Sequence, residues 1–165
     1  MESDYQSLFQ VRLANYDDIP AIMNITREAC VKHQKMSGVE NLAALEESYN
    51  DVKKDIDTKV VLLALSDGEP VGSVRVEVFP DKTAYLSRFA VKVTSQNNGI
   101  GKSIMNLVDK IMVKKGVTQI QLHTGSKITS LIRFYYGRGF YIDSTDKSRG
   151  YVRALLIKEY QKKDC

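Results

Sequence analysis

The chain has 165 residues, a length typical of one domain. Its 43% hydrophobic and 27% charged residues argue against a disordered, collagen-like or coiled-coil protein. Lys and Arg number 24 against 20 Asp and Glu, and this net charge of +4 is too mild and too scattered to predict a nucleic-acid-binding stripe.

Cysteine and histidine are sparse. The only cysteines are Cys30 and Cys165, so neither a disulfide framework nor a Cys-rich metal module is predicted. His33 and His123 have no accompanying ligand spacing, and we expect no metal. No window approaches the roughly 18 apolar residues of a membrane span, and the N-terminus carries no export signal. We therefore expect a soluble, cytoplasmic protein with no membrane or nucleic-acid partner.

The first third of the chain combines a strand pattern with helical patterns. A short strand is predicted over residues 11–13, and residues 1–10 are expected to fray. An acidic pair at 17–18 is typical of a helix start, and a capped amphipathic helix is predicted over 19–30. Apolar residues at steps of three and four predict a second helix over 42–56.

Three strands joined by two turns follow. The pattern predicts them over residues 60–65, 71–79 and 84–93, which implies two antiparallel hairpins in series. In the middle strand Arg75 and Glu77 alternate with valines that we expect to be buried. The simplest interpretation is that these two charged side chains face water.

The last third alternates helices and strands again. The predicted elements are a helix (100–111), a strand (117–124), a short helix (127–136) and two strands that can pair (140–142 and 151–157). No internal repeat or long linker interrupts this order. We therefore predict a single α/β domain over residues 1–165.

The most informative stretch is QNNGIGKS, from Gln96 to Ser103, between a predicted strand and a predicted helix. Glycine lets the backbone approach a ligand closely, and a helix start offers unpaired N–H groups that suit a phosphate. A P-loop would need Gly in place of Gln96, and a dinucleotide fingerprint would need Gly in place of Ile104. Both patterns fail, which leaves another phosphate loop or a Gly-rich turn without a ligand.

Two motifs in this chain resemble those of the GNAT superfamily of acyl-CoA-dependent N-acetyltransferases. Gln96, Gly99 and Gly101 fill the fixed places of its [Arg/Gln]-x-x-Gly-x-[Gly/Ala] motif. The preceding stretch 86–91 looks like the family's strand that ends in Ala-Val. Residues 134–140, FYYGRGF, are similar to the family's Phe-Tyr-x-x-x-Gly-Phe.

The resemblance implies a fold and covers nearly the whole chain, roughly residues 11–160. A GNAT-like α/β (α+β) domain has a mixed, mostly antiparallel sheet, here with about four flanking helices. The fourth and fifth strands of that sheet splay apart, and CoA lies in the gap. Splayed strands leave backbone N–H and C=O groups unpaired, which is costly when they are buried. The pantetheine amides of CoA can satisfy those groups.

The resemblance also implies acetyl-CoA as co-substrate and no metal. In the family, main chain at positions matching Ala90, Val91 and Val93 pairs with pantetheine, and amides matching 98–102 hold the pyrophosphate. Many members have an Asn that bonds pantetheine where this chain has Ile128, and Thr129 or Ser130 would take over that contact. The candidate cofactor-binding residues are Phe89, Ala90, Val91, Val93, Gln96, Asn97, Asn98, Gly99, Ile100, Gly101, Lys102, Ser103, Ser130 and Phe134.

The mechanism implied by the resemblance is direct attack of a neutral amine on the thioester within a ternary complex. The Val91 amide would meet the developing oxyanion, and Tyr135 would protonate the departing thiolate. Glu77 is the candidate base, with a relay through water as the alternative. A purely packing role for the Tyr135 ring stays open. Arg88 and the polar segment 143–149 could line the acceptor entrance or simply form surface.

Three functions remain in competition. The leading one is an N-acetyltransferase acting on a primary amine, with a small molecule as the expected acceptor and a peptide or protein amine as the alternative. A non-catalytic acyl-CoA-binding module would keep the groove without turnover, and a P-loop-like nucleotide binder would prefer ATP to CoA. The resemblance also allows a homodimer, because many members of the family dimerise.

Overall fold

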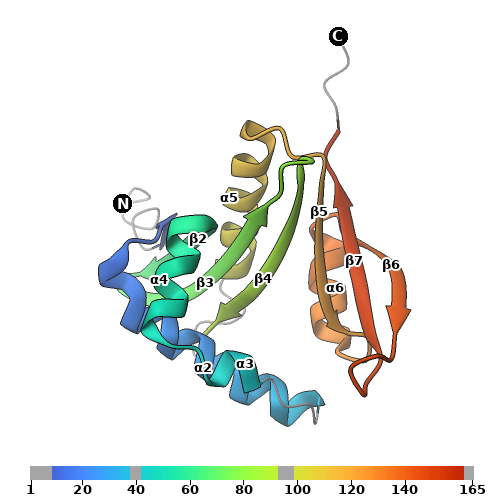
Figure 1. Ribbon diagram of the computed structural model, residues 1–165, viewed down its shortest axis with the longest axis horizontal. Coiled ribbons are helices and arrows are strands. Elements are labelled where there is room, and N and C mark those ends of the chain that lie inside the picture. Colours follow the sequence, from blue (N-terminus) through green and yellow to red (C-terminus); the bar gives the residue numbers. More distant parts are fainter. Residues whose placement is uncertain (1–8, 38–41, 93–98, 162–165) are drawn as a thin grey trace, which may run out of the picture.

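The computed structural model describes residues 9–37, 42–92 and 99–161, and they form one seven-stranded sheet with helices on both faces (Figure 1). The strand order is β1-β2-β3-β4-β5-β7-β6. The elements are β1 (Phe9–Leu13), η1 (Tyr16–Asp18), α2 (Ile19–Ser37), α3 (Leu42–Leu45), α4 (Tyr49–Thr58), β2 (Val60–Ser66), β3 (Glu69–Val78), β4 (Thr83–Val91), α5 (Ile100–Lys114), β5 (Gln119–Gly125), α6 (Thr129–Gly137), β6 (Tyr141–Asp146) and β7 (Arg153–Glu159). No helix in these ranges is long and apolar enough to cross a membrane.

Each face of the sheet carries its own hydrophobic core. On one face α5 buries Ile104, Val108 and Met112 against apolar side chains of β2 to β5 and β7. On the other face α2 and α4 cover Val61 and Leu63 of β2. The alternation of the predicted strands therefore identified buried positions, and the predicted mixed sheet is confirmed.

The splayed strands are also confirmed, because β4 and β5 pair over only a short length. They are the one parallel pair of the described sheet, joined by Thr83, Ala84 and Tyr85 opposite residues 119–121. Beyond these residues β4 continues to Val91, and no further pairing with β5 occurs in the described part of the chain. The two strands separate visibly toward their C-terminal ends (Figure 1).

Two helices take the place of the single helix that was predicted over residues 42–56. The helix breaks at Glu46, Glu47 and Ser48, and α4 then begins at a capping box. The Asp51 amide donates to Ser48 Oγ at 3.1 Å, and the Ser48 amide donates to Asp51 Oδ2 at 2.9 Å. This reciprocal cap satisfies amides that a helix start leaves unpaired, so it favours a new helix here. The described α-helices number five instead of about four.

Arg75 is buried instead of facing water, which corrects the expectation from the sequence. Its side chain is 1% exposed, under the layer of α2 and α4. Its guanidinium donates to Glu47 Oε2 and Oε1 at 2.5 and 2.6 Å and to Asp55 Oδ2 at 2.9 Å. The paired carboxylates compensate the cost of burying the charge. The helix break brings Glu47 to this position.

A bulge in β4 changes the direction of its side chains. The register with β3 shifts between Ser73 and Arg75, and Arg88 has φ +54°, a left-handed conformation that few non-glycine residues adopt. Leu86, before the bulge, packs in the core beneath α5, whereas Ala90, after it, packs in the core beneath α2. The bulge thus re-aims the last residues of β4 where the strand leaves β5.

Candidate active site

A cavity of about 220 Å³ lies where β4 and β5 separate. Helices α2 and α3 line it from one face of the sheet, and α6 lines it from the other. Its walls include Thr26, Cys30, His33 and Ala44 from the helical side, Ser87 to Ala90 from β4, Leu122 to Gly125 from β5, and Leu131, Tyr135 and Tyr151. Three predicted site residues, Phe89, Ala90 and Tyr135, therefore meet in one cavity.

Tyr135 sits at the α6 side of this cavity inside an aromatic cluster. Its ring centre is 5.4 Å from that of Phe134, 5.6 Å from Phe140 and 6.1 Å from Phe89. The side chain is 5% exposed, and burial raises the pKa of its phenol far above the ordinary value. The hydroxyl donates no hydrogen bond to a described residue, so it keeps a proton that it can give to a ligand in the cavity.

Gly101 lets α5 approach this aromatic cluster closely. A Cβ at Gly101 would lie 3.2 Å from the Phe89 ring and 3.3 Å from the Phe134 ring, both tighter than ordinary contacts. These two rings stack with centres 5.5 Å apart. The second glycine of the motif is therefore explained by packing in this structure, and both predicted phenylalanines lie beneath the start of α5.

The first turn of α5 offers backbone donors near the end of β4. Gly99 is its N-cap in a left-handed conformation, with no side-chain cap, and the Ser103 amide bonds to the Gly99 carbonyl at 3.0 Å. The amides of Ile100, Gly101 and Lys102 precede this first intrahelical bond, as expected at a helix start. Such a turn suits an anion. The other predicted residues of this loop, Val93, Gln96, Asn97 and Asn98, lie outside the described residues.

Glu77 is not among the residues that line the cavity. It is half-buried on β3 and lies opposite Tyr85 of β4. The Tyr85 hydroxyl is 2.7 Å from His123 Nδ1, and His123 does line the cavity. Burial, followed by the charge of Arg153, lowers the pKa of His123, which keeps the imidazole neutral near pH 7. The structure thus adds His123 to the site.

Sequence reasoning missed His123 because the residue was judged only as a metal ligand. The usable signal was that His123 follows Leu122 in a predicted strand, because the alternation of that strand assigns Leu122 to the core. Its side chain must then point to the opposite face of the sheet. Across the described residues, no group of three or more His, Cys, Asp or Glu side chains is arranged to hold a metal ion.

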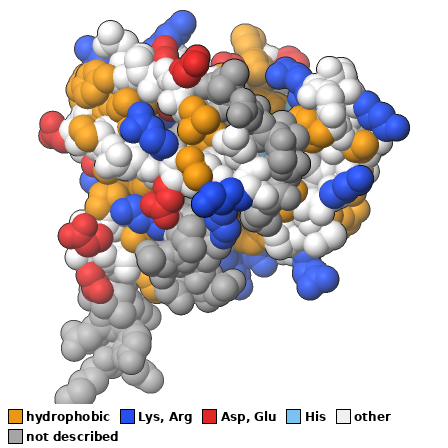
Figure 2. Space-filling model, turned by 90° about the horizontal axis from the view of Figure 1, so that it is seen from below, with side chains coloured by type: hydrophobic (Ala, Val, Ile, Leu, Met, Phe, Trp, Pro, Cys, Tyr) orange, Lys and Arg blue, Asp and Glu red, His pale blue; other side chains and the backbone are white. Residues whose placement is uncertain are grey.

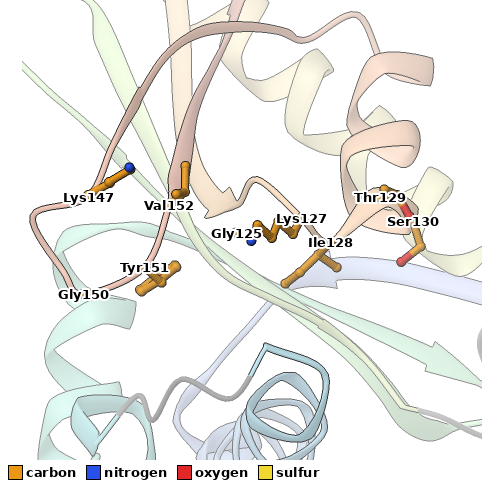
Figure 3. A pocket seen from close by; sticks show the side chains of 9 residues that line it. All are labelled: Gly125, Lys127, Ile128, Thr129, Ser130, Lys147, Gly150, Tyr151 and Val152. Atoms are coloured by element: carbon orange, nitrogen blue, oxygen red, sulfur yellow. The ribbon is translucent and has the colours of Figure 1, made fainter.

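A larger cavity, of about 690 Å³, lies beside the first (Figure 3). One wall is the segment from Lys127 to Ser130 at the start of α6, and the other is the turn between β6 and β7 with Lys147, Gly150 and Val152. Both cavities include Gly125 and Tyr151, so they adjoin. The predicted residue Ser130 is exposed in this second cavity, and Arg88 of the predicted acceptor entrance lies in the first.

The comparisons with known proteins agree with this geometry. The model of the "Acetyltransferase (GNAT) family" matches residues 20–140. A curated relative from Thermoplasma acidophilum, described as "Spermidine N(1)-acetyltransferase", is 24% identical over 149 residues, which cover 84% of this chain and 92% of the relative.

Two solved structures show the same fold. The PaiA N-acetyltransferase of Thermoplasma acidophilum in complex with coenzyme A has a TM-score of 0.82 and 22% identity, over 92% of this chain and 99% of that chain. The ribosomal-protein-S18-alanine N-acetyltransferase of Escherichia coli has a TM-score of 0.74 and 14% identity, over 95% and 98% of the two chains. The curated relative is named for spermidine and the Escherichia coli protein for an alanine of a ribosomal protein, so the fold alone does not select an acceptor.

Proposed function

The chain belongs to the acetyltransferase (GNAT) family and is an acetyl-CoA-dependent N-acetyltransferase, and we propose that its acceptor is a primary amine of a small molecule. The observation that carries this proposal is the cavity at the open end of β4 and β5, with the protonated Tyr135 hydroxyl at its wall. The relative named for spermidine supports a small acceptor. We place the enzyme in the cytoplasm and keep the homodimer as its expected assembly.

The described residues fit acetyl-CoA at three points. The pairing of β4 with β5 ends at Tyr85 opposite Gln121 although β4 continues to Val91, and this separation of the two strands suits an extended ligand with amides. The α5 start, from Gly99 to Lys102, presents amides to a diphosphate. Tyr135 lies between these strands on the α6 side. Bound there, acetyl-CoA supplies the acetyl thioester that the amine attacks.

The proposed chemistry divides among three groups. The Val91 amide donates to the carbonyl oxygen, where negative charge develops as the amine nitrogen attacks the carbon. As the C–S bond breaks, the Tyr135 hydroxyl gives its proton to the sulfur, and the free thiol leaves. The attacking nitrogen loses a proton to a base. The net change is one amide formed and one thioester consumed.

Two residues compete for the role of base. Glu77 was expected because it lies on the hairpin strand next to the proposed acceptor cleft, and it is not among the residues that line the cavity. His123 lines the cavity, and the Tyr85 hydroxyl fixes its Nδ1 atom. A neutral imidazole whose Nδ1 carries the proton leaves Nε2 free to accept one. We therefore assign the base to His123 and keep Glu77 as the alternative that variants can separate.

Thermal unfolding and CoA release test this proposal together. Acetyl-CoA at about 100 times its dissociation constant stabilises a protein by about 2.7 kcal/mol, which is an easily measured shift. The enzyme should also release free CoA with at least one small amine of a broad panel. Stabilisation without release from any amine or peptide would favour a non-catalytic acyl-CoA-binding module. Stabilisation by ATP and not by CoA would favour a nucleotide binder.

A further inference from the structure

The two adjoining cavities carry basic side chains and, among the described residues, no carboxylate. Arg88 lines the smaller cavity, and Lys127 and Lys147 line the larger one. In the view from below, Lys and Arg side chains border the right-hand part of the molecule, and the left-hand part carries both basic side chains and most of the visible Asp and Glu side chains (Figure 2). A site built for an acceptor with several ammonium groups would need the opposite charge.

Arg88 is the one Lys or Arg side chain in the described lining of the smaller cavity, which it shares with Tyr135 and His123. Its Nε atom is buried and makes no hydrogen bond within the described structure. It is also held in the left-handed conformation of the β4 bulge. Such strain persists where the surroundings require a particular side-chain position, and it occurs often at ligand sites.

The nearest carboxylate does not balance the charge of Arg88. Glu47 Oε2 lies 3.5 Å from Arg88 Nε, but both Glu47 oxygens already accept hydrogen bonds from Arg75. Asp55, the other partner of Arg75, is shared with Lys59 at 3.3 Å. The ion pairs of this cluster thus join three cations to two carboxylates. A cation without full compensation beside a cavity attracts an anionic ligand group.

We infer that the acceptor is a small aminocarboxylate whose carboxylate binds Arg88 while its amine lies between His123 and Tyr135. This inference rests on the proposed acetyl transfer and names its substrate class. A polyamine would bring a second ammonium group against Arg88, where like charges repel. The volume of about 220 Å³ favours a small molecule over a peptide.

Binding of acetylated products tests this inference without any need for turnover. Isothermal titration calorimetry on CoA-saturated protein would compare N-acetylglycine and N-acetyl-β-alanine with their uncharged carboxamides and with N-acetylputrescine. A charge-assisted bond to a guanidinium predicts that at least one carboxylate binds roughly tenfold tighter than its carboxamide. In R88Q this ratio should fall to about one, and in R88K part of it should remain.

A matched control separates a local contact from general charge. K114Q removes the same charge at the far, exposed end of α5 and should keep the wild-type ratio. The affinity of R88Q for CoA reports whether that variant stays folded. If R88Q does not fold, the preference of the wild-type protein for the carboxylate over its carboxamide still tests the inference.

Several results would overturn the inference. One is that the carboxamides or N-acetylputrescine bind as tightly as the carboxylates or more tightly, and another is that R88Q keeps the preference for carboxylate over carboxamide. The inference also fails if no product binds measurably, or if an acidic N-acetylated peptide binds more tightly than the small carboxylates. The proposed function fails separately, when no amine or peptide yields free CoA.

Discussion

The hydroxyl of Tyr135 is the group on which the residue-scale chemistry depends. It is enclosed by three aromatic rings, and burial raises its pKa, so it stays protonated across the working pH range of most enzymes. In the proposed mechanism, the thiolate that leaves at this site needs a proton. A phenol with a raised pKa is available to give it at every such pH.

Y135F should therefore lower kcat by about a hundredfold, the usual scale for loss of one general acid. The hydroxyl donates no hydrogen bond to a described residue, so thermal stability and CoA affinity should hold. Steady-state kinetics and calorimetry check these values. Y136F is the matched control, because Tyr136 is its neighbour on α6 and is 51% exposed. Equal kcat in both variants would leave Tyr135 with a packing role only.

The acidic limb of the pH–rate profile should report His123. Burial lowers the pKa of His123, so kcat/KM should fall only when the pH decreases below the ordinary histidine value of about 6.5. Arg153, Asp146, Arg149 and Tyr85 face this imidazole. Protonation also destabilises the fold, because the unfolded chain binds that proton more readily, so stability decreases through the same range as the pH falls.

Two variants identify the base from that profile. H123Q should lower kcat/KM and remove the acidic limb, and Y85F should shift the limb because it frees His123 Nδ1. If Glu77 is the base, E77Q removes the limb instead and H123Q leaves it in place. Profiles between pH 5 and 9 with a saturating acetyl-CoA concentration distinguish these cases.

At this scale the sequence predicts residues that belong to a motif and misses those that tertiary contacts define. Tyr135 was predicted from the FYYGRGF stretch, and it does line the cavity. The burial of Arg75 could not be predicted, because its partners lie 28 and 20 residues away and no local pattern links them. His123 was missed for the related reason that its role depends on Tyr85 of another strand.

Among the elements, the α3–α4 segment depends on Arg75 for its attachment to the sheet. Removing the guanidinium in R75M takes both hydrogen bonds away from Glu47, which is 9% exposed, and leaves it only the longer 3.5 Å contact with Arg88 Nε. Breaking a buried pair in this way typically costs about 3 to 5 kcal/mol. Urea unfolding measures the loss. R153Q breaks the more exposed pair with Asp146 and should cost less than about 1 kcal/mol. Similar losses in both variants would contradict this account.

The position of α5 depends on Gly101. A methyl group there would press on the Phe89 and Phe134 rings, and such overpacking typically costs about 1 to 3 kcal/mol. G101A should therefore lower stability despite the better helix propensity of Ala, and it should weaken CoA binding by moving the α5 start. G137A meets nothing within 4 Å and should be neutral or stabilising. A stabilised G101A would show that the rings yield easily.

The periodicity of the sequence predicted which segments form helices and which form strands. It did not predict where a helix breaks or where a strand bulges. The stripe from Leu42 to Ile56 keeps its helical spacing across the break, so the pattern cannot reveal it. The capping pair Ser48 and Asp51 was the available signal. The bulge at Arg88 is invisible for a different reason, because it depends on the register with β3.

At the scale of the whole molecule, β5, β7 and β6 are attached to the rest of the sheet through a short parallel seam. Residues 83–85 and 119–121 form that seam, and α5 spans the junction on one face. The α/β class followed from the order of the predicted elements, whereas the splay followed from the family resemblance, since composition and periodicity say nothing about where two strands part. The residues that would bind the acceptor could not be predicted from the resemblance, because α2, α3 and the β6–β7 turn carry no motif.

Hydrogen exchange should reveal this division of the molecule. Without ligand, amides near the C-terminal ends of β4 and β5 should exchange faster than those of β2 and β3, which pair along both edges. Acetyl-CoA should slow exchange in β4, β5 and the start of α5 far more than in β6. Uniform slowing over all strands would instead indicate global stabilisation without a ligand between β4 and β5.

The gap between β4 and β5 also sets a chemical requirement on whatever fills it. On the proposed mode of binding, the pantetheine arm acts as a short surrogate strand, and its two amides matter as much as its length. An analogue with esters at those two places would have the same contour but could not donate to backbone carbonyls. The ratio of its inhibition constant to that of CoA would measure how much affinity comes from completing the sheet.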